Sequence, residues 1–179
     1  MALSEACLTT IVLICPTYAK NKTYHGFGEN DKRILVISPD ASNCDDINDF
    51  LHDCATLFSG TNTLIILDDC AVSKDLKKRS NKFTNFAVSG RHEGLSVWVL
   101  TQQLTSIAKP FRENVACVVV FHNPSQIGTK TLFKDYGGDL DTDTRKKFVE
   151  LLKSERYSRI CFCLRYSFHL YFQVPAVSI

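Results

Sequence analysis

The stretch Thr63-Leu-Ile-Ile-Leu-Asp68-Asp69 places four large aliphatic residues directly before two adjacent carboxylates. A short, nearly continuous aliphatic run is typical of a strand that is covered on both faces, as in a parallel sheet. Six other apolar runs alternate with longer segments, and they span residues 10–15, 34–38, 95–101, 115–121, 159–164 and 168–174. This alternation predicts an α/β fold with a mainly parallel sheet, in which the last two runs form an antiparallel hairpin at one edge.

The longer segments between these runs have helical patterns. In the first of them, apolar residues recur at the spacing of one helix face: Ile47, Phe50, Leu51, Cys54 and Phe58. We expect helices over residues 45–58, 73–88, 103–113, 124–136 and 142–155. At 179 residues and 20.2 kDa, the chain suits a single domain spanning 1–179.

Composition excludes several classes of protein. Hydrophobic residues make up 45% of the chain and charged residues 22%, which is typical of a globular protein and not of a disordered tail or a coiled coil. No apolar run approaches the roughly 20 residues that cross a bilayer, and the N-terminus does not resemble a secretory signal. None of the eight cysteines belongs to a C-x-x-C pair, which argues against a zinc knuckle. Four of them lie in apolar runs, where we expect free cysteines to act as small buried hydrophobic residues: Cys15, Cys117, Cys161 and Cys163. We therefore expect a reducing, intracellular location, not a secreted protein, with no membrane segment.

Two strand ends carry side chains suited to catalysis. Adjacent carboxylates at a strand tip repel each other, and a bound Mg²⁺ relieves that repulsion. Asp68 can then ligate the metal while Asp69 activates a water, as the acids of a Walker B motif do. The alternative is that the two acids have a structural role, in an Asx turn or a helix cap. Gln102 follows the apolar run over 95–101, and its amide can hydrogen-bond a γ-phosphate. The alternative is that Gln102 is an ordinary solvated loop residue.

The near-neutral total charge of +2 conceals a strongly basic segment. Between Ser73 and His92 there are six basic residues and one acidic residue. We expect a DNA-binding face from five of them, Lys74, Lys77, Lys78, Arg79 and Lys82, although an ordinary solvated helix face is the alternative. The sixth, Arg91, follows Gly90 and suits a guanidinium that reaches a phosphate across a subunit boundary, or else a surface ion pair.

Taken in order, these motifs resemble one family. The set comprises Ile14-Cys-Pro-Thr-Tyr18 with Asn21-Lys-Thr-Tyr24, Leu64-Ile-Ile-Leu-Asp-Asp69, Ser89-Gly-Arg-His92, Leu95-Ser-Val-Trp-Val-Leu-Thr-Gln102, Ile107-Ala-Lys-Pro-Phe-Arg-Glu-Asn114 and Val118-Val-Val-Phe121. It is similar to the viral genome-packaging ATPases of the FtsK/HerA group, found in poxviruses, other large DNA viruses and Polinton-like elements. The resemblance extends from about residue 10 to about residue 155.

This resemblance implies a RecA-like P-loop NTPase fold, a three-layer sandwich with a mainly parallel sheet. It also implies hydrolysis of ATP with Mg²⁺, a homo-oligomeric ring, and translocation of double-stranded DNA into a shell of capsid proteins. Carried over by motif, Asp68 would ligate the magnesium and Asp69 would activate water. Gln102 would sense the γ-phosphate, and Arg91 would act on a neighbouring subunit's nucleotide.

One family element is missing. The sequence contains no phosphate-binding loop of the form G-x-x-x-x-G-K-[ST], so the first strand and its P-loop are expected to be absent. A truncated product, a decayed paralogue and a loop supplied by another polypeptide all fit this. We expect poor ATP hydrolysis by the chain alone and an open sheet edge prone to aggregation. A non-catalytic DNA- or capsid-binding module is the alternative, and a two-metal nuclease is disfavoured because no further Glu or Lys follows the acid pair at the usual spacing.

Overall fold

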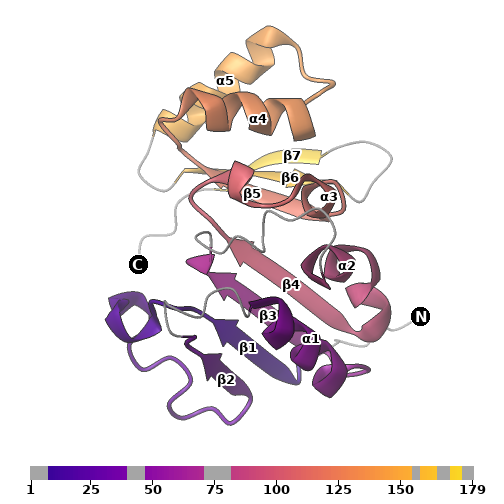
Figure 1. The fold of residues 1–179 in the computed structure, drawn as a ribbon. Coiled ribbons are helices and arrows are strands. Elements are labelled where there is room, and N and C mark those ends of the chain that lie inside the picture. The colour runs from indigo at the N-terminus through magenta and orange to yellow at the C-terminus, as the bar shows by residue number, and fades with distance from the viewer. Residues whose placement is uncertain (1–7, 40–46, 71–81, 155–157, 165–169, 175–179) are drawn as a thin grey trace, which may run out of the picture. The chain divides into compact units, whose positions relative to one another are not determined.

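A computed structural model describes residues 8–39, 47–70, 82–154, 158–164 and 170–174 (Figure 1). The chain divides into two compact units, Met1–Phe111 and Arg112–Ile179. Each unit is built around its own sheet.

The first unit contains a four-stranded parallel sheet. Its strands are β1 (Thr10–Ile14), β2 (Ile34–Ile37), β3 (Thr63–Asp68) and β4 (Leu95–Leu100), in the order β2-β1-β3-β4. The middle of this sheet is fully buried, with Leu13, Ile65 and Leu67 completely inaccessible to solvent. Continuous aliphatic strands are stable in these positions because both of their faces are removed from water.

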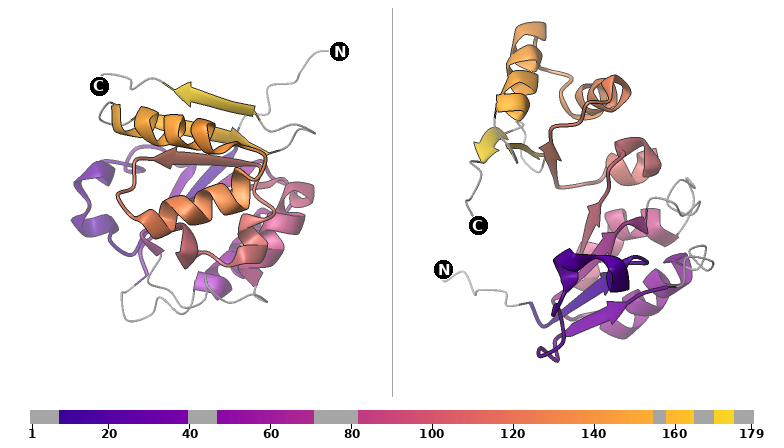
Figure 2. Two further views of the ribbon diagram at one scale, coloured as in Figure 1. Left: turned by 90° about the horizontal axis from the view of Figure 1, so that it is seen from above. Right: turned by 90° about the vertical axis from the view of Figure 1, so that its left-hand side faces the viewer.

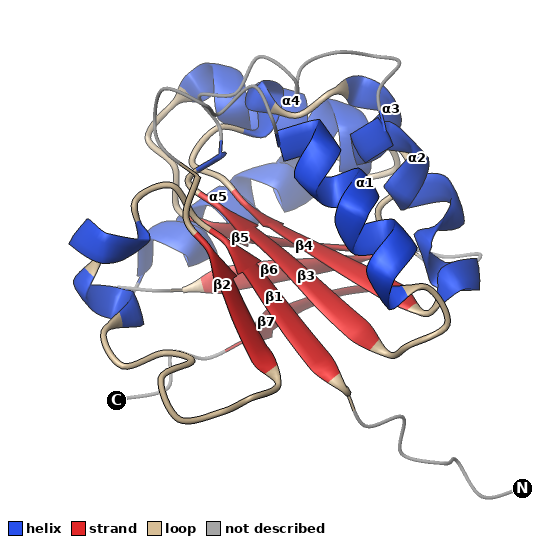
Figure 3. Cartoon of the chain, turned by 60° about the horizontal axis from the view of Figure 1, so that its bottom comes forward, coloured by secondary structure: helices blue, strands red, loops and turns tan. Residues whose placement is uncertain are grey.

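Two helices lie side by side on one face of the parallel sheet (Figure 3). They are α1 (Ile47–Phe58), which buries Leu51 and Cys54, and α2 (Lys82–Ser89), which buries Phe86. Short 3₁₀ turns complete the connections: η1 (Tyr18–Lys20), η2 (Lys22–Tyr24), η6 (Gly90–Glu93) and η7 (Leu104–Ser106). A four-residue helix, α3 (Lys109–Arg112), lies at the boundary in sequence between the two units.

The second unit contains an antiparallel sheet and two helices (Figure 2). The strands β5 (Cys117–Phe121), β6 (Arg159–Cys163) and β7 (Leu170–Val174) pair in that order. The helices are α4 (Gln126–Tyr136) and α5 (Thr142–Ser154). Helix α5 packs on β6, where the rings of Phe148 and Phe162 meet edge to face with centroids 6.3 Å apart.

The predicted strands are confirmed. All seven runs form strands, and the last two pair as the expected antiparallel hairpin. The run over 115–121 differs in its pairing, because β5 joins β6 in a second, antiparallel sheet. The expectation of one domain spanning 1–179 stays a prediction.

Most predicted helices are confirmed, with one correction. Helices α1, α4 and α5 match the predicted segments, whereas the expected helix over 103–113 is wrong. In its described structure that segment contains η7 and the short α3, because Pro110 lacks the N–H that a helix continuing from residue 103 would need, whereas proline is tolerated in the first turn of a new helix. The helix predicted over 73–88 is confirmed from residue 82 onward, where α2 begins. Residues 73–81 lie outside the described structure. No helix in the described part of the chain is both long enough and apolar enough to cross a membrane.

Candidate functional site

The carboxyl ends of three parallel strands meet at one edge of the four-stranded sheet. Ile14 of β1 pairs with Leu67 of β3, and Asp68 pairs with Leu100 of β4. In parallel α/β sheets this edge is where ligands bind. It is therefore the place to look for the chemistry of the first unit.

Asp68, the last residue of β3, is held by two donors. The Tyr24 hydroxyl donates to Asp68 Oδ2 at 2.7 Å, and the backbone N–H of Asp69 donates to Asp68 Oδ1 at 3.0 Å. Burial raises the pKa of the Tyr24 phenol above its ordinary 10.0, and the hydrogen bond to Asp68 raises the pKa further. Tyr24 is thus a protonated donor at neutral pH, and it fixes the orientation of the half-buried Asp68 carboxylate.

Asp69 is exposed and has unusual backbone geometry. Its Oδ2 accepts a hydrogen bond from the Thr17 hydroxyl at 2.8 Å. Its φ angle is +54°, and no other described residue apart from glycine has a positive φ. An L-residue held in this left-handed region costs about 1–3 kcal/mol, and such strain is often found at functional sites. The turn directs the two adjacent carboxylates to different partners.

The loop after β1 supplies both side-chain donors and is braced by aromatic rings. Tyr18 stacks on Tyr24 with ring centroids 6.1 Å apart, and Phe27 meets Tyr24 edge to face at 5.8 Å. The Tyr18 hydroxyl donates to the Phe27 carbonyl at 2.8 Å. These contacts limit the rotamers of Tyr24 and so keep its hydroxyl on Asp68.

Gln102 is also at the carboxyl edge. It is exposed and lies two residues beyond Leu100, the register partner of Asp68. The turn that carries it is ordered by Thr101, whose Oγ1 accepts from the Gln103 N–H at 3.2 Å. The structure therefore places Gln102 at the same sheet edge as Asp68 and Asp69.

Arg91 is at the other end of the sheet. It belongs to η6, which leads into the amino end of β4, and its side chain is outside the described structure. The following Gly94, with φ +71°, approaches the Thr61 carbonyl so closely that a Cβ would lie 2.8 Å from the oxygen. A six-residue strand is about 20 Å long, so the structure does not bring Arg91 together with the Asp68–Asp69 pair of its own chain.

The proposed DNA-binding residues are mostly outside the described structure. Four of them lie outside the described residues: Lys74, Lys77, Lys78 and Arg79. Lys82 is the first residue of α2, but only its backbone is described. Their DNA-binding role stays a prediction.

Sequence reasoning assigned no role to Tyr24 or Thr17, which hold the acid pair. Both stand in the segment after β1 that carries the family resemblance, and their distance in sequence from Asp68 and Asp69 conceals the contacts. A tyrosine or threonine just beyond a buried strand is a usable signal, because parallel strands bring such positions to one edge.

The oxygen atoms of this edge fit a hard cation. Mg²⁺ prefers oxygen ligands and is usually held by one or two carboxylates together with waters and substrate phosphates. Asp68 and Asp69 offer carboxylates with remaining lone pairs, and Asp69 is open to solvent. No G-x-x-x-x-G-K-[ST] motif occurs in the sequence, so the donor set fits the cation but includes no phosphate-binding loop.

Comparison with known proteins places the fold. No family model matches the chain, and no curated protein matches its sequence. Among solved structures, the chain is similar to the genome packaging NTPase B204 of Sulfolobus turreted icosahedral virus 2 in complex with sulfate, with a TM-score of 0.71 at 16% identity over 94% of this chain and 82% of that one. The AMPPCP complex of B204 gives a TM-score of 0.66 at 14% identity over 95% and 84% of the two chains.

A third similar structure is B204, the DNA-packaging ATPase of Sulfolobus turreted icosahedral virus, with a TM-score of 0.63 at 13% identity over 92% of this chain and 82% of that one. At these identities the likeness concerns the fold alone. The chain thus has a mixed α/β fold with a parallel four-stranded sheet, which matches the P-loop NTPase-like fold of these viral packaging proteins.

Proposed function

We propose that this chain is a module of an ATP-dependent viral genome-packaging machine, in which Asp68 and Asp69 form the Mg²⁺-binding and water-activating part of the site. The observation that carries the proposal is the acid pair at the tip of β3, where Tyr24 and Thr17 hold the two carboxylates separately. The similarity of the fold to viral packaging NTPases supports it, as does the motif order of the FtsK/HerA group.

The roles of the acids follow from their positions. Asp68 is half-buried and held on both oxygens, which suits a fixed magnesium ligand. Asp69 is exposed and accepts one side-chain hydrogen bond, which suits a base that accepts a proton from an attacking water. When bound, Mg²⁺ neutralises negative charge on nucleotide phosphates. Gln102, at the same edge, is proposed to contact the terminal phosphate.

The remaining parts of the site are proposed to come from other subunits. Arg91 lies at the far end of the sheet from its own acid pair, so a role on a neighbouring subunit's nucleotide, in a homo-oligomeric ring, is the one that its position supports. The 179 residues contain no phosphate-binding loop, so a loop from outside this sequence is proposed to complete the site. Double-stranded DNA and capsid proteins are the proposed partners, and the host cell interior is the proposed location.

Nucleotide binding by the full chain tests the proposal. Because the 179 residues include no phosphate-binding loop, we expect only weak binding of a non-hydrolysable ATP analogue at high concentration. We expect this binding to strengthen when Mg²⁺ is added, and Asp68→Asn to abolish the Mg²⁺ dependence. Asp31→Asn is the matched control, because Asp31 is an acid of the same unit that pairs with Arg33 at 2.7 Å. The non-catalytic DNA- or capsid-binding module would be favoured instead if Asp68→Asn and the wild type bound the analogue equally at every Mg²⁺ concentration.

A further inference from the structure

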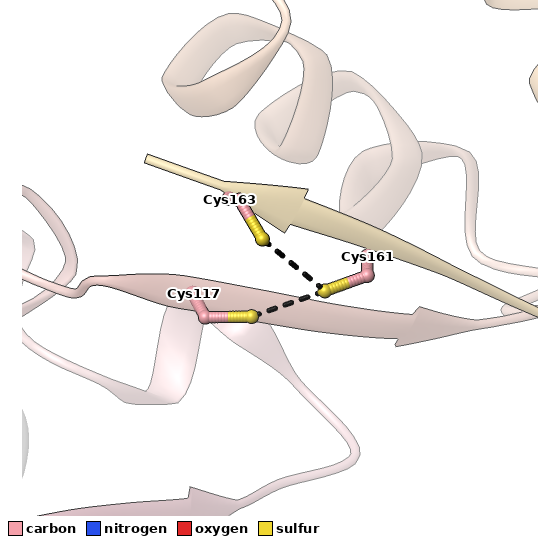
Figure 4. A group of neighbouring side chains, drawn as sticks. All are labelled: Cys117, Cys161 and Cys163. Atoms are coloured by element: carbon pink, nitrogen blue, oxygen red, sulfur yellow. Dashed lines mark hydrogen bonds between the residues drawn. The ribbon is translucent and has the colours of Figure 1, made fainter. Parts of the chain in front are cut away.

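Three cysteine side chains meet on the antiparallel sheet of the second unit (Figure 4). Cys117 begins β5, while Cys161 and Cys163 lie on β6. Cys117 and Cys163 are register partners, and Cys161 lies diagonally across from Cys117. Residues two apart on a strand point to the same face, so the three thiols share one face of the sheet.

The distances between the sulfur atoms suit a common ligand. The Sγ atoms of Cys117 and Cys161 are 3.1 Å apart, and those of Cys161 and Cys163 are 3.9 Å apart. All three sulfurs lie within 4.8 Å of one another. Three thiolates bound to one Zn²⁺ with Zn–S bonds of about 2.3 Å have sulfurs about 3.8 Å apart in a tetrahedral arrangement. Only small side-chain adjustments are therefore needed to close the set around an ion.

The surroundings of the cluster also suit a thiophilic ion. Cys161 is buried and Cys163 half-buried, whereas Cys117 is exposed and gives an entry path from solvent. Phe162, between the two β6 cysteines, packs on Phe148 of α5, so the thiols lie on the face of the sheet that is turned away from this helix.

We propose that Cys117, Cys161 and Cys163 form a binding site for Zn²⁺ or a similar thiophilic d¹⁰ cation that joins β5 to β6, with a solvent molecule as the fourth ligand. Binding converts the three thiols to thiolates and releases their protons to solvent. A disulfide would use only two of the sulfurs and would require them to approach to about 2.05 Å. The exposure of Cys117 corrects the expectation that this residue is a small buried hydrophobe. The signal in the sequence is the Cys-x-Cys spacing at 161 and 163, which a search for C-x-x-C pairs overlooks.

Metal titration of the reduced full chain tests this site. We expect one Zn²⁺ per chain in competition with a chromophoric chelator, and one Cd²⁺ per chain with an ultraviolet sulfur-to-metal charge-transfer band. Cys117→Ser and Cys163→Ser should each lower the Zn²⁺ affinity by at least about tenfold, since even loss of an outer-shell partner often costs that much. Zn²⁺ should raise the melting temperature of the wild type more than that of either variant.

Cys54→Ala is the matched control, because Cys54 is a buried cysteine of α1 in the first unit, far in sequence from the cluster. It should bind Zn²⁺ and Cd²⁺ like the wild type. Cys117 is exposed, so Cys117→Ser should fold normally, and circular dichroism checks that it does. Absence of stoichiometric Zn²⁺ binding by the wild type, or an unchanged affinity in Cys117→Ser, would overturn the proposal. A Cys117–Cys161 disulfide found by mass spectrometry in protein kept under reducing conditions would overturn it as well.

Discussion

The Tyr24 hydroxyl donates a 2.7 Å hydrogen bond to Asp68, which lies 44 positions later in the chain and at the end of a neighbouring strand. This bond ties the loop after β1 to the acidic tip of β3.

Removing the Tyr24 hydroxyl should loosen Asp68 without changing the charge of the site. We expect Tyr24→Phe to destabilise the fold by about 1 kcal/mol and to weaken the Mg²⁺-dependent part of nucleotide binding by several-fold, because the carboxylate loses a fixed donor. Urea unfolding and calorimetric titration measure the two effects. Tyr18→Phe is the control, since the Tyr18 hydroxyl donates to a backbone carbonyl at 2.8 Å. An equal loss of Mg²⁺ dependence in Tyr18→Phe would assign the effect to packing of the loop.

Substitutions at Asp69 can separate the effect of its positive φ on stability from the role of its carboxylate. Asp69→Gly should be more stable than Asp69→Ala by about 1 kcal/mol, because glycine accepts φ +54° without the clash that a Cβ causes. Asp69→Asn should come near the wild type in stability, since asparagine tolerates this conformation, yet it should lose general-base function. Urea midpoints of the three variants provide the comparison. Equal stability of the Gly and Ala variants would mean that the turn relaxes when its side chain changes.

Asp141 should make the stability of α5 sensitive to acid. Its carboxylate caps the helix by accepting from the Thr144 N–H at 2.8 Å and the Asp143 N–H at 2.9 Å. These bonds, those of Thr144 foremost, hold the pKa of Asp141 below its ordinary 3.8. A lowered pKa in the folded state stabilises the fold above pH 3.8 and loses that effect as the pH falls through the folded value.

Asp141→Ala should therefore unfold at lower temperature than the wild type at pH 7, and the difference should shrink below pH 3.8. Melting curves across this range measure the effect. Asp143→Ala is the control, because Asp143 pairs only weakly with Lys146, at 3.5 Å on the surface. If both variants showed the same pH dependence, general surface charge and not the cap would be responsible.

The outer strand β4 should favour self-association. Trp98 is 60% exposed and Leu100 is 46% exposed, and in the described part of the sheet β4 pairs only with β3. Unpaired strand edges with apolar side chains template aggregation, and a lysine blocks it. Trp98→Lys should reduce light scattering at high protein concentration. Ser96→Lys adds the same charge two residues away, and an equal reduction there would show that charge alone suffices.

The basic segment should bind DNA without regard to sequence. We expect Lys74, Lys77 and Lys78 changed together to Gln to flatten the plot of log K against log salt by about two to three units, because each phosphate contact contributes about −0.9 for duplex DNA. Changing Lys146, Lys147 and Lys153 of α5 to Gln alters net charge equally and should leave the slope unchanged. A wild-type slope in the first triple variant would assign the segment to an ordinary solvated face.

The amino-acid pattern alone predicted the class of fold and the strand that carries the acid pair. Runs such as Leu64–Leu67 are short and uniformly aliphatic, which favours a strand buried on both faces, and the alternation with helical segments predicts parallel pairing. Helices α1, α4 and α5 were equally readable, because their patterns are long enough to be unambiguous. The short segment around Pro110 was predicted wrongly because its apolar periodicity was given more weight than the proline, whose missing backbone N–H interrupts a helix.

Contacts between side chains that lie far apart in the sequence became known only from the three-dimensional structure. The donation from Tyr24 to Asp68, the left-handed turn at Asp69 and the meeting of three thiols on β5 and β6 all depend on strand register. The antiparallel pairing of β5 with β6 was likewise hidden, because an apolar run indicates that a strand is buried but not the direction of the neighbouring strand. Local patterns specify elements through short-range sterics and burial, whereas contacts across 44 residues follow from the packing of the whole sheet.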